Sequence, residues 1–254
     1  MSTGFRKFWI WRTLSALAIL YCPSLPVTEL QLGAFQTDLS QETIVQRARY
    51  YRSLEIKKPA ARSTLTVWKA PSSYDQLLTQ ASLVVLGQFL EQKSRLSGDQ
   101  LHIETVCIFR IDRVIGGQID WAGVPMQARV LPEVDMQPLK DNEIPVIRLG
   151  GKLELFGVQL EEIETAYAAF KNKQSYILFL HTPPVFSKYP EHYGRSLIKV
   201  YETIAGPHSV IKVAKPNAGD SRIETLVNNP QLRTELQTKF QSKLSLFLEH
   251  FKKE

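Results

Sequence analysis

Residues 101–115 read LHIETVCIFRIDRVI, a long stretch in which apolar and polar side chains alternate. One face carries Leu101, Ile103, Thr105, Cys107, Phe109 and Ile111, and the opposite face includes His102, Glu104, Arg110 and Asp112. Because successive side chains of a strand point to opposite faces of a sheet, this period of two predicts a long β-strand. We therefore expect Cys107 and Phe109 to lie in a core.

A second β-rich run, SLVVLGQFL at residues 82–90, precedes this stretch. Ser97-Gly98-Asp99 lies between the two runs and is typical of a turn, so the two runs predict a long β-hairpin. Gly116-Gly117 ends the second strand, since glycine permits the sharp turns that follow strands.

The chain downstream alternates between apolar runs and turn-rich segments. We expect strands at residues 126–131, 151–160, 175–181, 197–204 and 209–213. Residues 132–145 predict a loop, because they hold three prolines and five charged side chains. Residues 161–171, EEIETAYAAFK, predict a short helix.

Helical patterns flank the strands on both sides. Ile44, Ala48 and Tyr51 recur at helical spacing, Arg47, Arg49 and Arg52 are expected to face outward, and the pattern fades at Lys57-Lys58-Pro59. Ser72 or Ser73 can cap a helix that runs to Gln80. After Pro230 one amphipathic helix is expected, with its apolar stripe made by Leu232, Leu236, Phe240, Leu244 and Phe247-Leu248.

The composition is that of an ordinary globular protein. Of the 254 residues, 44% are hydrophobic and 22% are charged, which excludes wholesale disorder, collagen and a polytopic membrane protein. We divide the chain into a signal peptide or signal anchor (1–26), a linker with an N-terminal helical arm (27–70), a β-barrel domain (71–215) and a C-terminal helix (216–254).

The first 26 residues, MSTGFRKFWIWRTLSALAILYCPSLP, have the layout of a secretory signal. Arg6, Lys7 and Arg12 make a basic start, and an apolar run is then ended by Pro23 and Pro26. The 14 residues 8–21 fall short of the roughly 20 that span a bilayer, so a signal is favoured over a transmembrane helix. We expect an exported protein, periplasmic or extracellular, that contacts a membrane only through an uncleaved leader.

The two cysteines, Cys22 and Cys107, provide no disulfide framework. Tyr21 occupies the position where a lipoprotein box carries a small residue, so Cys22 is interpreted as an ordinary leader residue. Cys107 has no intrachain partner beyond the leader, so stability must come from a packed core, and we expect an inert, buried thiol.

Four segments carry a resemblance to a known group of domains. They are residues 81–87 (ASLVVLG), 109–117 (FRIDRVIGG), 150–151 (GG) and 175–180 (SYILFL), in that order within residues 77–213. Their succession resembles exported bacterial domains of uncharacterised function that have a netrin-like, TIMP-like OB-fold. The resemblance implies a mainly β fold with flanking α: a small closed OB-like, TIMP-like barrel with an N-terminal helix and a C-terminal amphipathic helix. Protease inhibitors of that branch present a free N-terminal cysteine, which here would require cleavage between Tyr21 and Cys22, and several disulfides, for which Cys107 alone is not enough.

Local motifs assign no catalytic, cofactor-binding or metal-binding residue, and we expect no cofactor. The five histidines (His102, His181, His192, His208 and His250) form no His-Glu-x-x-His pair. Ser196-Leu197-Ile198-Lys199 would place Ser and Lys on opposite faces of a strand, and Gly150-Gly151-Lys152 lacks the first glycine of a phosphate loop. Glu161, Glu162 and Glu164 are interpreted as the exposed acidic start of a helix.

These observations favour an exported, non-catalytic binding protein with an unknown protein or small-molecule partner. Nucleic acid is excluded as a partner, because the excess of positive charge falls from +6 to +3 without the leader. Phe186, Tyr189, His192 and Tyr193 in the loop 182–195 either contact a ligand or pack over a barrel end. Two alternatives stay open: an envelope enzyme, such as a hydrolase, with a dispersed active site, and a structural or assembly protein that docks through its C-terminal helix.

Overall fold

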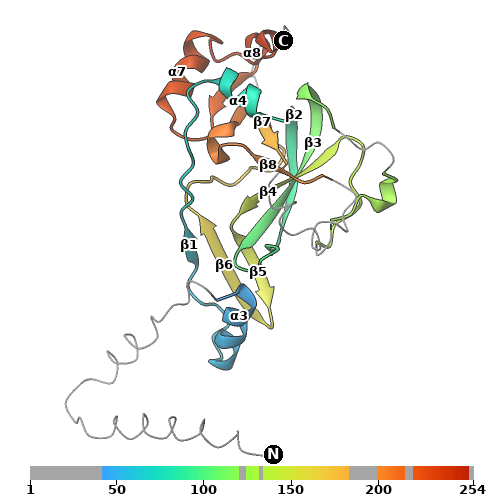
Figure 1. Cartoon of the computed structure of the whole chain (residues 1–254), viewed down its shortest axis with the longest axis vertical. Coiled ribbons are helices and arrows are strands. Elements are labelled where there is room, and N and C mark those ends of the chain that lie inside the picture. Colours follow the sequence, from blue (N-terminus) through green and yellow to red (C-terminus); the bar gives the residue numbers. More distant parts are fainter. Residues whose placement is uncertain (1–41, 120–123, 132–133, 183–198, 215–219, 252–254) are drawn as a thin grey trace, which may run out of the picture. The chain divides into compact units, whose positions relative to one another are not determined.

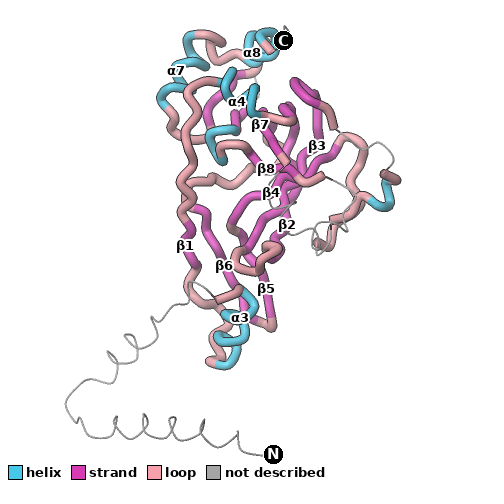
Figure 2. Tube along the Cα trace, viewed as in Figure 1, coloured by secondary structure: helices cyan, strands magenta, loops and turns pink. Residues whose placement is uncertain are grey.

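The computed structural model describes residues 42–119, 124–131, 134–182, 199–214 and 220–251, and its compact unit begins at Thr43. The fold is mainly β with flanking helices (Figures 1 and 2). Over these residues, two sheets contain β1 (Arg62–Thr64), β2 (Leu83–Leu96), β3 (Ile103–Gly117), β4 (Glu143–Leu149), β5 (Gly151–Leu155), β6 (Val158–Glu164), β7 (Ser175–His181), β8 (Tyr201–Thr203), β9 (Val210–Ala214) and β10 (Arg222–Thr225). The helices are α3 (Ile44–Ser53), α4 (Tyr74–Gln80), α7 (Pro230–Thr238) and α8 (Leu244–His250), with 3-10 turns at Met126–Ala128 and Gly206–Ser209.

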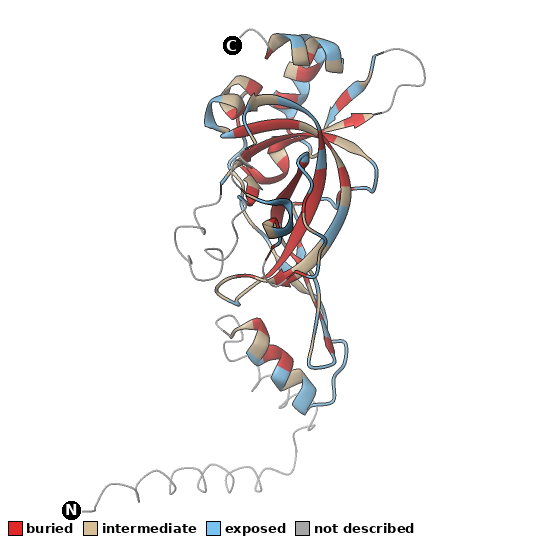
Figure 3. Cartoon of the chain, turned by 90° about the vertical axis from the view of Figure 1, so that its right-hand side faces the viewer, coloured by how far each residue is buried: buried red, intermediate tan, exposed pale blue. Residues whose placement is uncertain are grey.

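The predicted hairpin is confirmed. β2 and β3 pair antiparallel from Leu83↔Gly117 to Leu96↔Ile103. Cys107 and Phe109 are fully buried, as their face of the strand predicts. The opposite face of β3 is covered only in its first half, where Glu104 is 6% exposed and pairs with Arg95 at 3.2 Å, whereas Arg110 and Asp112 are exposed. The first half of β3 therefore lies between packed layers and the second half faces solvent on its outer side; Figure 3 colours the chain by this burial.

The larger sheet returns on itself through its last strand. Its order is β10-β9-β7-β2-β3-β4-β8. β8 pairs parallel with β4 through Val146↔Tyr201 and Ile147↔Glu202, and antiparallel with β7 through Leu180↔Thr203 and His181↔Glu202. Five strands, β2, β3, β4, β8 and β7, are thus linked in a cycle, in which β8 contributes two residue pairs on each side.

β4 corrects the expectation of a loop through residue 145. The strand includes Pro145, which pairs with Ile108. Asn142 O accepts a hydrogen bond from Ile111 N, and Gly150 N donates to Ile103 O, so even-numbered residues of β4 direct their backbone groups to β3. The nitrogen of Pro145 therefore points away from β3, so the proline removes no hydrogen bond from the pairing of β3 with β4.

The core has one apolar layer on each face of the larger sheet. The inner layer includes Phe109, Phe170, Tyr176, Leu178 and Tyr201, and the rings of Phe109 and Phe170 lie 5.0 Å apart, edge to face. The second layer lies between the sheet and the helices α4, α7 and α8, and its largest members are Tyr74, Phe179, Phe240 and Phe247.

Most of the C-terminal stripe is buried as expected, with Leu244 and Leu248 half-buried, but it belongs to two helices rather than one. Leu232, Leu236, Phe240 and Phe247 are at most 2% exposed. Gln241 and Ser242 adopt positive φ angles of 50° and 53°, which interrupt the helix. The interruption lets Ser242 O accept from Ile223 N and Leu244 N donate to Ser221 O, so the chain between the helices pairs with β10.

The smaller sheet, in the order β1-β6-β5, corrects two predictions. The single strand expected at 151–160 is a hairpin of β5 and β6, because Phe156 and Gly157 adopt positive φ angles of 54° and 79°. The helix expected at 161–171 is also wrong, since β6 continues to Glu164 and pairs parallel with β1. Neither β1 nor β10 was expected.

The N-terminal arm contains the expected helix, α3, with one difference. Thr43 caps it by accepting a hydrogen bond from Gln46 N, and Ile44 and Ala48 are buried against β6 and the end of the hairpin. Arg47, expected to face outward, is only 9% exposed, whereas Arg49 and Arg52 are exposed.

Several expectations lie wholly or partly outside the described residues. The leader 1–26 lies outside them, as do the aromatic residues of the loop 182–195 and Ser196 to Ile198. Residues 126–131, expected to be a strand, contain a 3-10 turn, and of 197–204 only Tyr201–Thr203 is strand. No helix in the part of the chain that the structure describes is long and apolar enough to cross a membrane.

Candidate functional site

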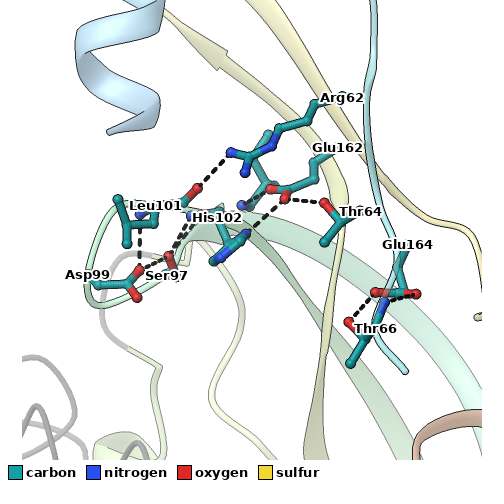
Figure 4. A network of polar contacts seen from close by, with 10 residues as sticks. Arg62, Thr64, Thr66, Ser97, Asp99, Leu101, His102, Glu162 and Glu164 are labelled. Atoms are coloured by element: carbon teal, nitrogen blue, oxygen red, sulfur yellow. Dashed lines mark hydrogen bonds and ion pairs between the residues drawn. The ribbon is translucent and has the colours of Figure 1, made fainter. Parts of the chain in front are cut away.

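Two carboxylates of β6 that the sequence placed on an exposed helix are buried. Glu162 and Glu164 are 2% and 4% exposed, and β1 lies parallel beside them. Thr64 Oγ1 donates to Glu162 Oε1 and Thr66 Oγ1 donates to Glu164 Oε2, each at 2.6 Å (Figure 4). Backbone amides complete both sites: Ile103 N donates to Glu162, and the amides of Thr66 and Ala166 donate to Glu164. These carboxylates tie residues 62–66 to the smaller sheet.

His102 completes the network around Glu162. Its Nδ1 lies 2.9 Å from Glu162 Oε1. The hydrogen bond with Glu162 raises the pKa of His102 above its ordinary value, against the opposing effect of burial. Burial by itself raises the pKa of Glu162, but hydrogen bonds from His102, Thr64 and the Ile103 amide outweigh it, so the net pKa is lowered. The geometry and both shifts favour a charged pair.

Replacing His102 with asparagine should therefore destabilise the protein in a pH-dependent way. The contribution of His102 is complete below its ordinary pKa of 6.5 and is lost as the pH rises through the raised value. The contribution of Glu162 is complete above its ordinary pKa of 4.5 and is lost as the pH falls. We expect a loss of about 1–2 kcal/mol between these limits and a smaller loss at pH 9.

Urea unfolding of the wild type and of His102→Asn at several pH values measures this difference. Glu162→Gln is the matched control, because without the carboxylate the His102→Asn change should cost the same at each pH. A wild-type difference that stays constant from pH 5 to pH 9 would show that folding does not shift the pKa of His102, and it would contradict the charged pair.

A cleft of about 490 Å³ opens beside this network. It is lined by Gln92, Ser94, Arg148, Gly150, Gly151, Lys152, Glu161, Glu162, Ile163, Glu164, Tyr167 and Ala169. Gly150 and Gly151 form the turn between β4 and β5 with positive φ angles of 84° and 150°. A side chain at Gly151 would collide with the hydroxyls of Ser94 and Thr105, so the wall of the cleft requires glycine there.

Arg148, at the end of β4, is a charged group of the cleft that pairs with no acid among the described residues, although its guanidinium also hydrogen-bonds the buried thiol of Cys107. Its Nε is buried and has no hydrogen-bond partner among the described residues, and its guanidinium carbon lies 5.7 Å from the ring centre of Tyr167. The acids that line the cleft are already engaged: Glu161 pairs with Lys152 at 3.2 Å, and Glu162 and Glu164 accept the hydrogen bonds above. The arrangement can therefore donate hydrogen bonds to an anionic oxygen beside an aromatic ring.

The potential nucleophile nearest to Arg148 is inert. Cys107 is fully buried, and burial raises the pKa of its thiol to about 12 in spite of the neighbouring positive charge of Arg148. Burial also raises the pKa of Tyr167, whose hydroxyl lies 3.3 Å from Thr203 Oγ1. Neither group is ionised near neutral pH, so neither neutralises the charge of Arg148.

A second polar group lies on the outer face of the larger sheet. Burial and the nearby carboxylate of Glu104 raise the pKa of Glu202 to about 7. His181 Nε2 lies 3.8 Å from Glu202, and burial lowers the pKa of His181. A carboxyl group that titrates near neutral pH is a feature of acid–base catalysts, although buried structural groups share it.

The structure brings together only some of the residues that the sequence drew attention to. Gly150-Gly151-Lys152 and the three glutamates meet in the cleft, whereas His208 and His250 lie elsewhere. No group of three metal-ligating side chains occurs in the described ranges. Sequence reasoning missed Arg148, for which the available signal was a lone cation after the apolar run 144–147.

No family model matches the chain, and no curated protein matches it.

Proposed function

We propose that this is an exported, non-catalytic binding protein built on a small OB-like, TIMP-like barrel. The proposed barrel is supported by the cycle of strands β2-β3-β4-β8-β7, in which β4 and β8 are parallel and the other pairs are antiparallel. The five-stranded Greek-key barrel of the OB-fold has the same arrangement. Export is supported by the basic and apolar leader, and cell fractionation with an intact-mass measurement tests it: full-length protein in the cytoplasm would overturn export.

The proposed binding site is the cleft beside β6, and the proposed ligand is a small carboxylate. The buried Nε of Arg148, which has no hydrogen-bond partner among the described residues, carries this proposal, because a guanidinium binds carboxylates through its N–H groups. The Tyr167 ring beside it favours a ligand with an apolar body. A dianion such as phosphate is disfavoured, since three glutamates and only two cations line the cleft.

Thermal unfolding with small ligands tests this proposal. Butyrate and benzoate should raise the unfolding temperature of the wild type, whereas butyramide and benzamide, which have the same shape without the charge, should not. Arg148→Gln should weaken binding at least about tenfold, because hydrogen bonds to charged groups contribute about 1.5–3 kcal/mol. Arg113→Gln, which removes an exposed cation of β3 outside the cleft, is the control. Equal stabilisation by acids and amides, or binding that Arg148→Gln retains, would contradict the proposal.

A dispersed active site at Glu202 and His181 is the second candidate, and the raised pKa of Glu202 favours it. Hydrolysis of ester or glycoside probes that rises or falls around pH 7 and disappears in Glu202→Gln would support an enzyme. The assembly alternative is less favoured, because Leu232, Leu236, Phe240 and Phe247 are buried within the chain itself and only Leu244 and Leu248 of the apolar stripe are half-buried.

A further inference from the structure

The excess of positive over negative charge is concentrated in one short region of the chain. Residues 43–70 hold seven Lys or Arg and one acid, whereas residues 71–254 hold twenty-one of each sign. Residues 71–254 therefore carry no net formal charge, and the net positive charge of residues 43–254 comes from α3 and the segment that follows it.

Four of these cations lie in what we call the basic tip, together with three apolar side chains. The basic tip consists of Arg49, Arg52, Leu54, Ile56, Lys57, Lys58 and Phe156. It is formed by the end of α3, the turn after it and the turn between β5 and β6, at the lower end of the unit in Figure 1. The guanidinium of Arg49 lies 5.5 Å from the Phe156 ring centre, and Lys57 O accepts a hydrogen bond from Gln159 N at 2.8 Å, so the segments are in contact.

The side chains of the basic tip are directed to solvent and leave their charges uncompensated. Leu54, Ile56 and Phe156 are 50%, 38% and 44% exposed, and the four cations are exposed as well. No ion pair joins any of these cations to an acid in the described ranges, and Glu55 is the one acid among residues 43–70. An interfacial membrane contact requires apolar side chains that enter the interface and cations that attract anionic headgroups. The exposed leucine, isoleucine and phenylalanine beside unpaired cations provide both.

We propose that the basic tip docks onto an anionic phospholipid surface, with the three apolar side chains in the interface and the four cations at the headgroups. Charge complementarity and the apolar side chains select lipid over nucleic acid, because a phosphate backbone alone would need only the cations.

Cosedimentation of the full chain with vesicles tests the proposal. Vesicles of phosphatidylglycerol and phosphatidylcholine should bind the protein, and pure phosphatidylcholine vesicles should bind it at least about tenfold more weakly, because each basic side chain near an anionic surface contributes about fivefold. The charge variant R49Q/R52Q/K57Q/K58Q and the apolar variant L54S/I56S/F156S should each lose at least about tenfold in affinity for the anionic vesicles.

Matched variants keep this test specific to the basic tip. K171Q/K173Q/R222Q/K243Q removes four exposed cations elsewhere, and V114S/M126S/I163S removes three exposed apolar side chains elsewhere; both should bind as the wild type does. Every variant carries the same leader, so equal binding by all of them would assign the contact to the leader and overturn the proposal. Equal binding to neutral and anionic vesicles, or tight oligonucleotide binding that the apolar variant retains, would overturn it as well.

Discussion

Replacing Phe109 with alanine is expected to lower the free energy of unfolding by about 3–5 kcal/mol, the usual cost of removing a fully buried ring. Phe109 is 0% exposed and lies at the centre of the inner core layer. Its ring contacts Phe89, Phe170 and Tyr176 at centroid distances of 5.6, 5.0 and 6.2 Å. Because these rings come from β2, β3, β7 and the segment after β6, the cavity would weaken several elements at once.

Denaturant unfolding measures this loss, and Val114→Ala provides the control. Val114 lies on the same strand but is 39% exposed, so its truncation should cost less than about 1 kcal/mol. Cys107 offers an independent readout, because a thiol reagent should reach this buried side chain only when the protein opens. Rapid labelling of Cys107 in the folded wild type, or equal costs at Phe109 and Val114, would contradict the assignment of the inner face.

The hairpin could be predicted because its signal is local. Alternation along residues 101–111 and the turn at Ser97-Gly98-Asp99 act over neighbouring residues, and a one-residue slip would move Cys107 and Phe109 out of the core. The C-terminal stripe was predictable for the same reason, since its period is set within the segment. Its interruption was not, because the hydrogen bonds from Ile223 N to Ser242 O and from Leu244 N to Ser221 O depend on where β10 lies.

The errors arose where a distant partner decides the local structure. Pro145 argued for a loop, but the proline is tolerated because its nitrogen faces away from β3. Residues 161–164 resembled an acidic helix start, yet Glu162 and Glu164 occupy alternate positions of a strand whose threonine partners lie 98 residues earlier. Hydrogen bonds from these distant donors stabilise the buried carboxylates, and the residues next to Glu162 and Glu164 in the sequence do not indicate them.

The candidate site could not be predicted, because its residues also depend on partners that are distant in the sequence. Arg148 and Tyr167 meet only because β4 ends beside the segment that follows β6, and the turn at Gly150-Gly151 opens the space between them. A search for local motifs finds groups that act at fixed spacing, whereas these residues are assembled by strand order. The cations of the basic tip are close together in the sequence and could be predicted from it. The position of Phe156 beside Arg49 could not, because it depends on how the chain folds.

Removing residues 230–254 is expected to abolish stable folding. The deletion removes Leu232, Leu236, Phe240 and Phe247, each at most 2% exposed, and uncovers Tyr74 and Phe179. Losing one such side chain costs about 2–5 kcal/mol, whereas whole domains are stable by only about 5–15 kcal/mol. The sum of these losses therefore exceeds what a domain of this size can tolerate, and the truncated chain should show no cooperative thermal transition.

A single substitution separates packing within the chain from an interface between copies. Phe247→Ala should cost about 3–5 kcal/mol and leave the molar mass measured by light scattering unchanged, because the ring packs against Tyr74 and Phe240 of its own chain at 5.4 and 4.9 Å. Leu248→Ala, at the neighbouring and half-buried position, should cost less. Unchanged stability together with a dimer that becomes a monomer would instead assign the stripe to an interface. If neither stability nor mass changes, the helices do not depend on packing their apolar side against the sheet. We do not expect this outcome, because Phe247 is 0% exposed.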